Sequence, residues 1–535
     1  KLFKLYRIDL LTPIGFWVFL DMPLACNLPE MTLVLLKFTF FLQAAAMPLF
    51  DPQSVPEHES SAFVHLFEWS WADVAKECEE WLGPKGFTAV QISPPMEHIQ
   101  GPSWWTRYQP VTYKLVSRSG DEKAFIDMIS RCKKVGVGIY ADAVTNHIAA
   151  GSGVGTAGSE YGHRKSPIYN ETDFHHHKWM LHFTEGLGYG SFTQQDLNHN
   201  CRVSNYHDKF NVQYCDLEGL PDLCTGCKKV QEKVAEYLTR MSDLGIAGFR
   251  VDAAKHQDAG ELGQLLARVP KHLYRFQEVI GGDQEPVIPS MYINNGQVTE
   301  FDYSRRLRDK FLADGKLSEL GSFGAELIPS NDAVVFIDNH DTQRGEASDI
   351  TYKSGKMYEL INVFMLAHPY GYPKVMSSYA FSNYGQGPPT SPVHSQEGLR
   401  CSNLDKLHNA SAPWICEHRW PAIANMVAWR KAAGKNLLTN FQAPGDNTVA
   451  FCRGTDACVA FNKQRHATWN AQLHFELPAG RYCNIIQSDD TSTCPVVEVA
   501  ADGTASFNVP PLSAVALHIG KQAPAAMVQV ASIFM

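Results

Sequence analysis

Short apolar runs alternate with amphipathic stretches along most of this 535-residue chain. A short apolar run between turn residues is typical of a buried strand, whereas apolar positions three or four residues apart are typical of a helix. The runs predict eight strands, at Phe63–Trp69, Thr88–Ser93, Val137–Val144, Ile246–Asp252, Arg275–Ile280, Val298–Tyr303, Ala333–Asp338 and Pro373–Ser377. Helices are predicted between them, among others at Trp71–Leu82, Asp121–Lys134, Lys228–Leu244, Ala259–Val269 and Pro421–Ala432. This alternation predicts an α/β protein with a parallel sheet, and eight such units predict a (β/α)8 TIM barrel.

Two segments depart from the alternation and divide the chain into domains. A tract rich in Gly, His, Asn and Ser follows the third strand and predicts a long insertion over residues 147–223. Short β-rich segments follow residue 436 and predict a C-terminal all-β sandwich domain over residues 436–520. The catalytic barrel would then consist of residues 47–146 and 224–435, and the tail 521–535 carries no motif.

The N-terminal region has the layout of a secretory signal peptide. Met31 opens an apolar run that ends in small residues at Ala44, Ala45 and Ala46, although Lys37 interrupts it. A membrane anchor is the alternative, but an uninterrupted span needs about 20 apolar residues. We therefore expect residues 1–46 to be an upstream segment plus a signal peptide, and the mature protein to be secreted.

Composition and charge narrow the class of partner. The chain is 44% hydrophobic and 19% charged, as expected of a folded protein with a sizeable core. Its net charge is −9 and no basic cluster occurs, so nucleic acid and anionic membranes are poor partners. We expect a monomer whose partner is its substrate. Asn170 and Asn409 begin glycosylation sequons, which are meaningful only in a secreted chain.

The cysteine count also favours secretion. Thirteen cysteines are present, and Cys26 falls in the segment expected to be removed. The remaining twelve can all form disulfides, as is usual in an oxidising compartment. Cys224 and Cys227 could instead begin a zinc site, but no second ligand pair lies at zinc-finger spacing.

Acidic residues stand at the ends of several predicted strands. Asp252, Glu278 and Asp341 follow or end the fourth, fifth and seventh strands. Active sites of such barrels lie at the carboxyl ends of the strands, so the three carboxylates are expected to share one mouth. Any one of them could be a capping or salt-bridged acid, whereas three together favour acid–base chemistry.

The segments that carry these acids resemble the four signature regions of the alpha-amylase family of glycoside hydrolases, in particular its animal-type, chloride-dependent branch. They are DAVTNH (142–147), GFRVDAAKH (248–256), FQEVI (276–280) and FIDNHD (336–341). Further matching stretches are FVHLFEW (63–69), GFTAVQISPP (86–95), WWTRYQP (104–110), AHPYGYPKVMSSY (367–379) and CEHRW (416–420). The resemblance runs from about residue 62 to residue 520.

The resemblance implies retaining endo-hydrolysis of alpha-1,4-glucosidic bonds in starch and glycogen. Retaining glycosidases pair a nucleophilic carboxylate with a carboxylic acid that also acts as base. By position in the motifs, Asp252 would be the nucleophile and Glu278 the acid and base. Asp341 would bind hydroxyl groups of the sugar and help to distort its ring. Other substrate contacts would come from His147 and His340 at the cleaved bond, Lys255 and His256 on the leaving side, and Trp104, Trp105, Tyr108 and Gln109 on the non-reducing side. A related alpha-glucosidase or transglycosylase, or a non-catalytic binding protein, is the alternative.

Two ions are implied as cofactors. A structural Ca²⁺ would take side-chain oxygens of Asn146 and Asp222 and backbone oxygens of Gln213 and His256, which would pin the insertion to the barrel.

An activating Cl⁻ would be held by Arg250, Asn339 and Lys374. Arg250 and Asp252 lie two residues apart on a strand and so point into the barrel together, where a guanidinium is costly unless paired. A salt bridge to Asp252 alone is the alternative. Because Lys374 stands where animal enzymes usually have arginine, we expect weaker chloride binding.

Two departures from the family pattern follow from the resemblance. The glycine-rich loop usual after the seventh-strand acid is missing, because Gly345 runs directly into Glu-Ala-Ser-Asp, which leaves substrate affinity and cleavage pattern open. Val116 stands where many vertebrate relatives have cysteine, so Cys78 is expected to pair with Cys132. The other pairs implied by the family are Cys201–Cys215, Cys401–Cys416 and Cys483–Cys494. Cys452–Cys458 and Cys224–Cys227 are expected only because these neighbours remain.

Overall fold

The computed structural model describes residues 60–175, 201–312, 314–345, 350–404, 407 and 412–524. The expected signal peptide, the sequon at Asn409 and the Glu-Ala-Ser-Asp segment after Gly345 lie outside the described residues. None of the described helices is long and apolar enough to cross a membrane.

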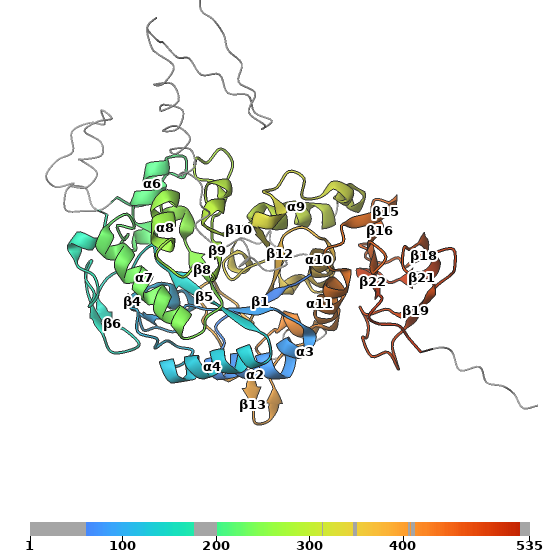
Figure 1. The fold of residues 1–535 in the computed structure, drawn as a ribbon, viewed down its shortest axis with the longest axis horizontal. Coiled ribbons are helices and arrows are strands. Elements are labelled where there is room, and N and C mark those ends of the chain that lie inside the picture. The colour runs from blue at the N-terminus through green and yellow to red at the C-terminus, as the bar shows by residue number, and fades with distance from the viewer. Residues whose placement is uncertain are drawn as a thin grey trace, which may run out of the picture. The chain divides into compact units, whose positions relative to one another are not determined.

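Eight parallel strands close into a barrel, in the order β1-β12-β11-β10-β9-β8-β5-β2 (Figure 1). The expected TIM barrel is therefore confirmed. Its strands are β1 (Phe63–Leu66), β2 (Ala89–Ile92), β5 (Gly138–Val144), β8 (Gly248–Asp252), β9 (Tyr274–Gln277), β10 (Gln297–Thr299), β11 (Ala333–Val335) and β12 (Tyr372–Ser377). Closure is made by β1, which pairs with β2 on one side and with β12 on the other.

The helices alternate with these strands and cover the barrel from outside (Figure 1). Side chains of Ser70, Asp121 and Asp258 cap the N-termini of the helices that follow them, each by accepting a backbone N–H. The helices are α2 (Trp71–Glu77), α3 (Gly83–Lys85), α4 (Glu122–Lys134), α7 (Lys228–Asp243), α8 (Ala259–Leu266), α9 (Phe301–Phe311), α10 (Lys356–Ala367) and α11 (Pro421–Ala433).

One strand prediction is partly wrong. The run Val298–Tyr303 was expected to be a single strand, but β10 ends at Thr299 and α9 begins at Phe301. The Glu300 side chain accepts the N–H of Asp302 and caps the helix. Tyr303, Leu307 and Phe311 are buried at four-residue spacing, which is helical periodicity hidden behind an apolar start.

The insertion between β5 and α7 contains β6 (Gly153–Val154), β7 (Glu160–Tyr161) and α6 (Lys209–Tyr214) among its described residues. It is anchored on the hairpin of β3 (Glu97–His98) and β4 (Pro110–Thr112). The buried Glu97 carboxylate accepts the N–H groups of Ala157 and Ser159, each at 2.9 Å, and the Thr112 hydroxyl at 2.5 Å.

The C-terminal domain consists of two four-stranded antiparallel sheets, β15-β16-β17-β22 and β18-β21-β20-β19 (Figure 1). One buried cluster contains Ala450 and Ala460 from the first sheet and Leu473 and Val497 from the second, so the sheets pack as a sandwich. The strands are β15 (Leu438–Gly445), β16 (Thr448–Arg453), β17 (Ala457–Asn462), β18 (Trp469–His474), β19 (Gly480–Cys483), β20 (Val496–Val499), β21 (Thr504–Val509) and β22 (Ser513–His518).

The outer face of the first sheet packs on the barrel. Phe451 and Phe461 contact Phe364 of α10, with ring centroids 6.0 and 5.6 Å away. Arg430 of α11 donates to the backbone oxygens of Ser61 and Gly371, both at 3.0 Å, and so ties α11 to both sides of the barrel seam.

The twelve described cysteines form six disulfides, in the same pairs that the sequence analysis expects. Cys224 and Cys227 are bonded to each other, which removes them as a zinc ligand pair. The six are Cys78–Cys132, Cys201–Cys215, Cys224–Cys227, Cys401–Cys416, Cys452–Cys458 and Cys483–Cys494.

Candidate active site

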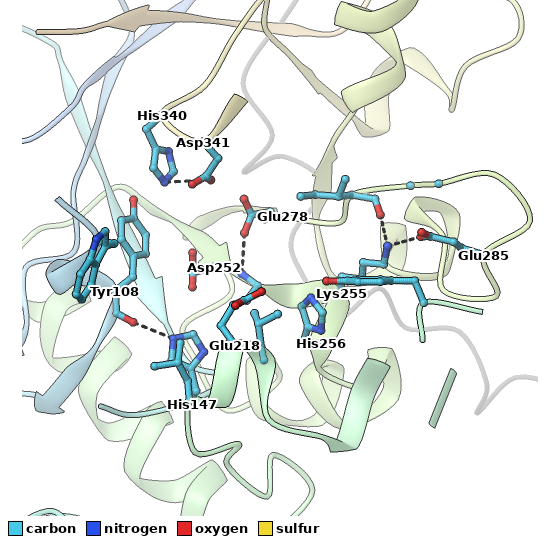
Figure 2. A pocket seen from close by; sticks show the side chains of 18 of the residues that line it. Tyr108, His147, Glu218, Asp252, Lys255, His256, Glu278, Glu285, His340 and Asp341 are labelled. Carbon is cyan, nitrogen blue, oxygen red and sulfur yellow. Dashed lines mark hydrogen bonds and ion pairs between the residues drawn. The ribbon is translucent and has the colours of Figure 1, made fainter. Parts of the chain in front are cut away.

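A pocket of about 510 Å³ opens at the carboxyl ends of the barrel strands. Asp252, Glu278 and Asp341 all line it, so the structure brings together the three acids that the sequence places on separate strands. In the view of Figure 2, Asp252 and Glu278 lie between the aromatic wall at Tyr108 and the Lys255 side chain. This is the position in which barrel enzymes carry their chemistry.

A single buried guanidinium holds two of these acids. Arg250 on β8 is 1% exposed, and its Nη1 donates to Asp252 Oδ1 at 2.8 Å, while its Nη2 donates to Glu278 Oε1 at 2.5 Å. Nη1 also donates to both carboxylate oxygens of Asp142 on β5, at 2.7 and 2.8 Å. The expected alternative of a salt bridge to Asp252 alone is therefore wrong, because Arg250 links three carboxylates.

A strained turn places the groups that follow Asp252. Ala253 has φ 48°, in the left-handed region that non-glycine residues seldom adopt. In this conformation its N–H donates to Glu278 Oε2 at 3.0 Å (Figure 2), and the N–H of Lys255 donates to the backbone oxygen of Glu278 at 3.1 Å. The turn thus fixes the carboxylate of Glu278 and sends Lys255 and His256 along the pocket wall.

Aromatic side chains form the opposite wall. Tyr108 stacks on His340 with ring centroids 5.1 Å apart, and its hydroxyl donates to Asp142 at 3.0 Å. Trp104 packs edge-on against both rings. His340 Nε2 lies 3.2 Å from Asp341 Oδ2 (Figure 2). The wall therefore orients Asp341 from behind through His340.

Burial sets the protonation of these acids. Burial, together with the charges of Glu278 and Asp142, raises the pKa of Asp252 well above its usual value against the opposing effect of Arg250. Burial and Glu278 raise the pKa of Asp341 to about 7. The side chain of Asp341 is still 40% exposed, so water weakens that effect. Like charges that lie close together in one pocket disfavour complete ionisation of the group.

The other expected substrate residues divide into those that line the pocket and one that does not. Trp104, Trp105, Tyr108, His147, Lys255, His256 and His340 all line it. Gln109 is absent from the lining, and its Oε1 accepts the N–H of Ala150 at 3.2 Å. Its Oε1 holds the start of the insertion, and the expected substrate contact of Gln109 stays a prediction.

The expected calcium residues lie where the insertion meets the barrel. Asn146 Oδ1, Asp222 Oδ1 and Gln213 Oε1 are buried and have no hydrogen-bond partner among the described residues. Buried polar atoms of this kind need a partner, and oxygen is the ligand atom that Ca²⁺ prefers. The expected donor on Gln213 was its backbone oxygen, whereas the unpaired atom is on its side chain. No cluster of three His, Cys, Asp or Glu that could hold a metal occurs in the described part of the chain.

The expected chloride residues fit an anion in part. Lys374 is 2% exposed, and its Nζ lies 4.7 Å from the ring centroid of Phe336. Burial and the nearby Arg250 lower its pKa to about 7. Asn339 Oδ1 accepts the N–H groups of Asp341 and Thr342, at 2.9 and 2.8 Å, which leaves only its amide group as a donor. An anion here would have to share Arg250 with the carboxylates.

Sequence reasoning missed several residues of the site. Asp142 lies in the apolar strand GIYADAV, two residues after Tyr140, which points into the barrel. Side chains two residues apart on a strand point to the same side, so this spacing could have identified Asp142 as an acid inside the barrel. Glu285 is another missed residue. It pairs with Lys255, whose Nζ also donates to the Ile280 carbonyl at 2.6 Å (Figure 2). No strand or motif spacing points to the other missed lining residues, which are Tyr206, Leu217, Glu218, Leu220, Gly281, Gly282 and Arg305.

Arg344 is a further residue that the sequence analysis did not single out. Its guanidinium carbon lies 4.2 Å from the ring centroid of Phe381, 5.0 Å from those of Phe67 and Tyr379, and 5.6 Å from that of Trp104. Its Nη1 donates to the backbone oxygen of His340 at 3.0 Å. These cation–π contacts join three loops behind the pocket wall.

Comparison with known proteins agrees with this geometry. Residues 81–275 match the model of the alpha-amylase catalytic domain, and residues 439–520 match that of the alpha-amylase C-terminal all-beta domain. An alpha-amylase of Tribolium castaneum is 41% identical over 490 residues, which cover 88% of this chain and 95% of that protein. An alpha-amylase of Streptomyces violaceus is 39% identical over 87% of this chain and 75% of its own length.

Solved structures give the same result. Alpha-amylase I of the earthworm Eisenia fetida superposes with a TM-score of 0.75 at 32% identity, covering 86% of this chain and 97% of its own. A variant of that enzyme has been solved in complex with maltohexaose. From the extent of these matches, the chain belongs to the alpha-amylase family of glycoside hydrolases.

Proposed function

We propose that this protein is a secreted, monomeric alpha-amylase that cleaves internal alpha-1,4-glucosidic bonds of starch and glycogen with retention of configuration. The observation that carries the proposal is the pair Asp252 and Glu278, held side by side by one buried guanidinium in the strand-end pocket. Two carboxyl groups that bind one guanidinium lie close together, which favours retention, because an inverting enzyme needs room for a water between its base carboxylate and the anomeric carbon. The six disulfides support secretion.

In the first half of the reaction Asp252 attacks the anomeric carbon, and Glu278 gives its proton to the leaving glycosidic oxygen. The bond from the anomeric carbon to that oxygen breaks as the bond to Asp252 forms. In the second half Glu278 takes a proton from water, whose oxygen displaces Asp252. The contacts from Arg250 orient Asp252, and the N–H of Ala253 holds Glu278 in place.

The remaining pocket residues bind the glucan on either side of the cleaved bond. His147, His340 and Asp341 hydrogen-bond the sugar that carries the reacting carbon. Lys255, fixed by Glu285, contacts the leaving side together with His256, and Trp104, Trp105 and Tyr108 pack against the non-reducing side.

Product analysis tests the proposed function. Soluble starch is expected to yield short oligosaccharides whose new reducing ends are alpha anomers, with a rapid fall in viscosity because bonds break internally. Maltose is expected to be cleaved far more slowly. Release of glucose from chain ends, or transfer to another sugar in place of water, would favour the alternative of an alpha-glucosidase or a transglycosylase.

We further propose that Ca²⁺ binds at Asn146, Asp222 and Gln213, with the backbone oxygen of His256 as a fourth ligand. Members of the alpha-amylase family generally bind calcium. The three buried side-chain oxygens without partners support this position. When bound, the ion would supply cross-linking between insertion and barrel and take no part in bond cleavage.

We also propose an activating Cl⁻ at Arg250, Asn339 and Lys374. The side chain of Lys374, buried near the guanidinium of Arg250, supports it, because two neighbouring cationic groups attract an anion. When bound, the anion would supply a negative charge near Glu278 and favour its protonated form.

Chloride is expected to raise starch turnover and to shift the pH optimum upward. Activity is measured across pH in chloride-free buffer and again after chloride is added. Lys374→Gln is expected to remove most of this response, whereas the exposed Lys431→Gln serves as a control and keeps it. A pH profile that chloride does not move in the wild type would leave Arg250 as a partner of carboxylates only.

A further inference from the structure

The segment Cys224-Thr-Gly-Cys227, called the CTGC turn below, has no role in the reaction proposed above. Its two cysteines are bonded to each other at a sequence separation of 3, compared with 6 to 54 for the other five disulfides of the described residues. In the chain-entropy account, a disulfide stabilises a fold more the longer the loop that it closes. This bridge therefore stabilises the fold least, and we expect the barrel to survive its reduction.

Cys227 is the accessible half of this bridge. Cys224 is 1% exposed, whereas Cys227 is partly exposed and lies between the exposed residues Gly226 and Lys228. Thiol–disulfide exchange requires access to a sulfur atom. A dissolved thiol can therefore reach this bridge more readily than the three bridges in which both cysteines are buried. Those three are Cys78–Cys132, Cys452–Cys458 and Cys483–Cys494.

Cys227 also stands at the start of a long helix. It is the N-cap of α7, whose first turn contains Lys228 and Lys229 and no acid, although Lys229 pairs with Asp173. A helix N-terminus and a nearby lysine favour the thiolate form of a cysteine and attract an anionic thiolate reagent. No described helix of eight residues or more begins at a cysteine of the two remaining bridges, Cys201–Cys215 and Cys401–Cys416.

The CTGC turn follows the segment by which the insertion returns to the barrel. The N–H of Leu223 donates to the backbone oxygen of Asn146, just after β5, at 2.8 Å. The N–H of Cys224 donates to the backbone oxygen of Asp173, within the insertion, at 2.9 Å. The N–H of Cys227 closes the turn by donating to the backbone oxygen of Cys224 at 2.8 Å. The bridge therefore lies where the insertion, the end of β5 and the start of α7 meet.

The two residues that the bridge encloses pack on α8. The Thr225 hydroxyl donates to Glu261 Oε2 at 3.0 Å. A Cβ atom on Gly226 would lie 2.6 Å from Glu261 Oε1, so the backbone of the turn lies directly on this carboxylate. Opening the bridge removes a covalent constraint on both residues and thus on the way in which the turn contacts α8.

We propose that Cys224–Cys227 is a redox-active bridge, which a dithiol reductant opens while the other described disulfides stay closed, and that its opening loosens the attachment of the insertion to the barrel. A thiolate of the reductant attacks Cys227 Sγ and forms a mixed disulfide, and Cys224 leaves as a thiolate that takes up a proton. The second thiolate of the reductant then attacks the reductant sulfur of the mixed disulfide and releases Cys227, which takes up another proton. Two electrons pass to the bridge, and the reductant becomes a cyclic disulfide.

Selective labelling tests whether the bridge opens first. The native protein is treated with rising concentrations of dithiothreitol, free thiols are blocked with iodoacetamide, and the labelled peptides are identified by mass spectrometry. Cys224 and Cys227 are expected to be labelled together at a reductant concentration about tenfold or more below that needed for any other described pair. Labelling of another pair first, or of all pairs at the same concentration, would overturn the proposal.

Hydrogen exchange tests whether the bridge controls the insertion. The amides of Leu223 and Cys224 are expected to exchange about tenfold faster after selective reduction, and to return to the slow rate after reoxidation with oxidised glutathione. The double variant Cys224→Ala, Cys227→Ala should show the fast rate without reductant. The control Cys452→Ala, Cys458→Ala removes the bridge with the next shortest separation and should keep the slow rate.

Equal exchange rates in the oxidised and the selectively reduced wild type would show that the bridge does not control the attachment, and would overturn that part of the proposal. Neither measurement uses a glucan. Failure of the proposed alpha-amylase function would therefore leave both results unchanged.

Discussion

Glu278→Gln and Asp252→Asn are each expected to lower starch turnover by about 10⁴-fold or more while the fold persists. Each amide has the shape of its acid, so the contacts with Arg250 and Ala253 can be largely kept. The glutamine has no acidic proton to give to the leaving oxygen, and the asparagine is a poor nucleophile. Turnover is measured on starch with purified variants whose melting curves and circular dichroism match those of the wild type.

A substrate whose leaving group needs no proton separates the two roles. With alpha-maltosyl fluoride, Glu278→Gln is expected to recover much of the first step, whereas Asp252→Asn is expected to remain inactive. Asp127→Asn on α4 is the control, because the same change of acid to amide is made there on an exposed side chain outside the pocket lining. It should lose far less activity than the two catalytic variants. Near-normal starch hydrolysis by either catalytic variant would show that the assignment is wrong.

Removing calcium is expected to lower the melting temperature of the wild-type protein by about 5 °C or more. A ligand that binds only the folded state stabilises it by about 4 kcal/mol when present at 1,000 times its Kd. The effect is expected to be large because, without the ion, three oxygens at the insertion interface stay buried and unpaired. The measurement is calorimetry after prolonged dialysis against chelator, followed by addition of Ca²⁺.

Asp222→Asn tests the position of the ion. It keeps the size of the side chain but removes its charge, so Ca²⁺ should raise the melting temperature less than in the wild type. Asp121→Asn is the control, because asparagine can still cap α4 and the change lies outside the insertion. Identical wild-type melting curves in chelator and in Ca²⁺ would rule out a stabilising site.

The parts of the fold that the sequence predicts well are those governed by local pattern. Most barrel strands lie within short, largely apolar runs, and the acids at strand ends lie in one pocket because parallel strands share a direction. The error at Tyr303 arose where two periodicities overlap at the end of β10. There the cap at Glu300 marks the start of the helix, and the apolar residues that follow it are buried at helical spacing.

The parts of the site that the sequence does not predict depend on loop conformation. Lys255 was expected to contact substrate, but its partner Glu285 lies on a loop with no periodic signal. Gln109 stands in a matching motif and yet turns to the backbone of Ala150. The rings around Arg344 come from three separate loops, so no spacing along the chain could reveal the contact.

The closure of the barrel by β1 and β12 has a consequence for the order in which the chain folds. Phe63 on β1 pairs with Lys374 on β12. The pairing of β1 with β12 can therefore form only after nearly the whole barrel has been synthesised. Contacts so distant in sequence are slow to form, and an open strand edge can pair wrongly in the meantime. The six disulfides do not bring β1 and β12 together. The longest sequence separation that any of them spans is 54 residues, and none joins a residue near β1 to one near β12. All six disulfides can therefore form while the barrel is still open, and we expect β12 and α11, with Arg430, to pack against β1 late in folding.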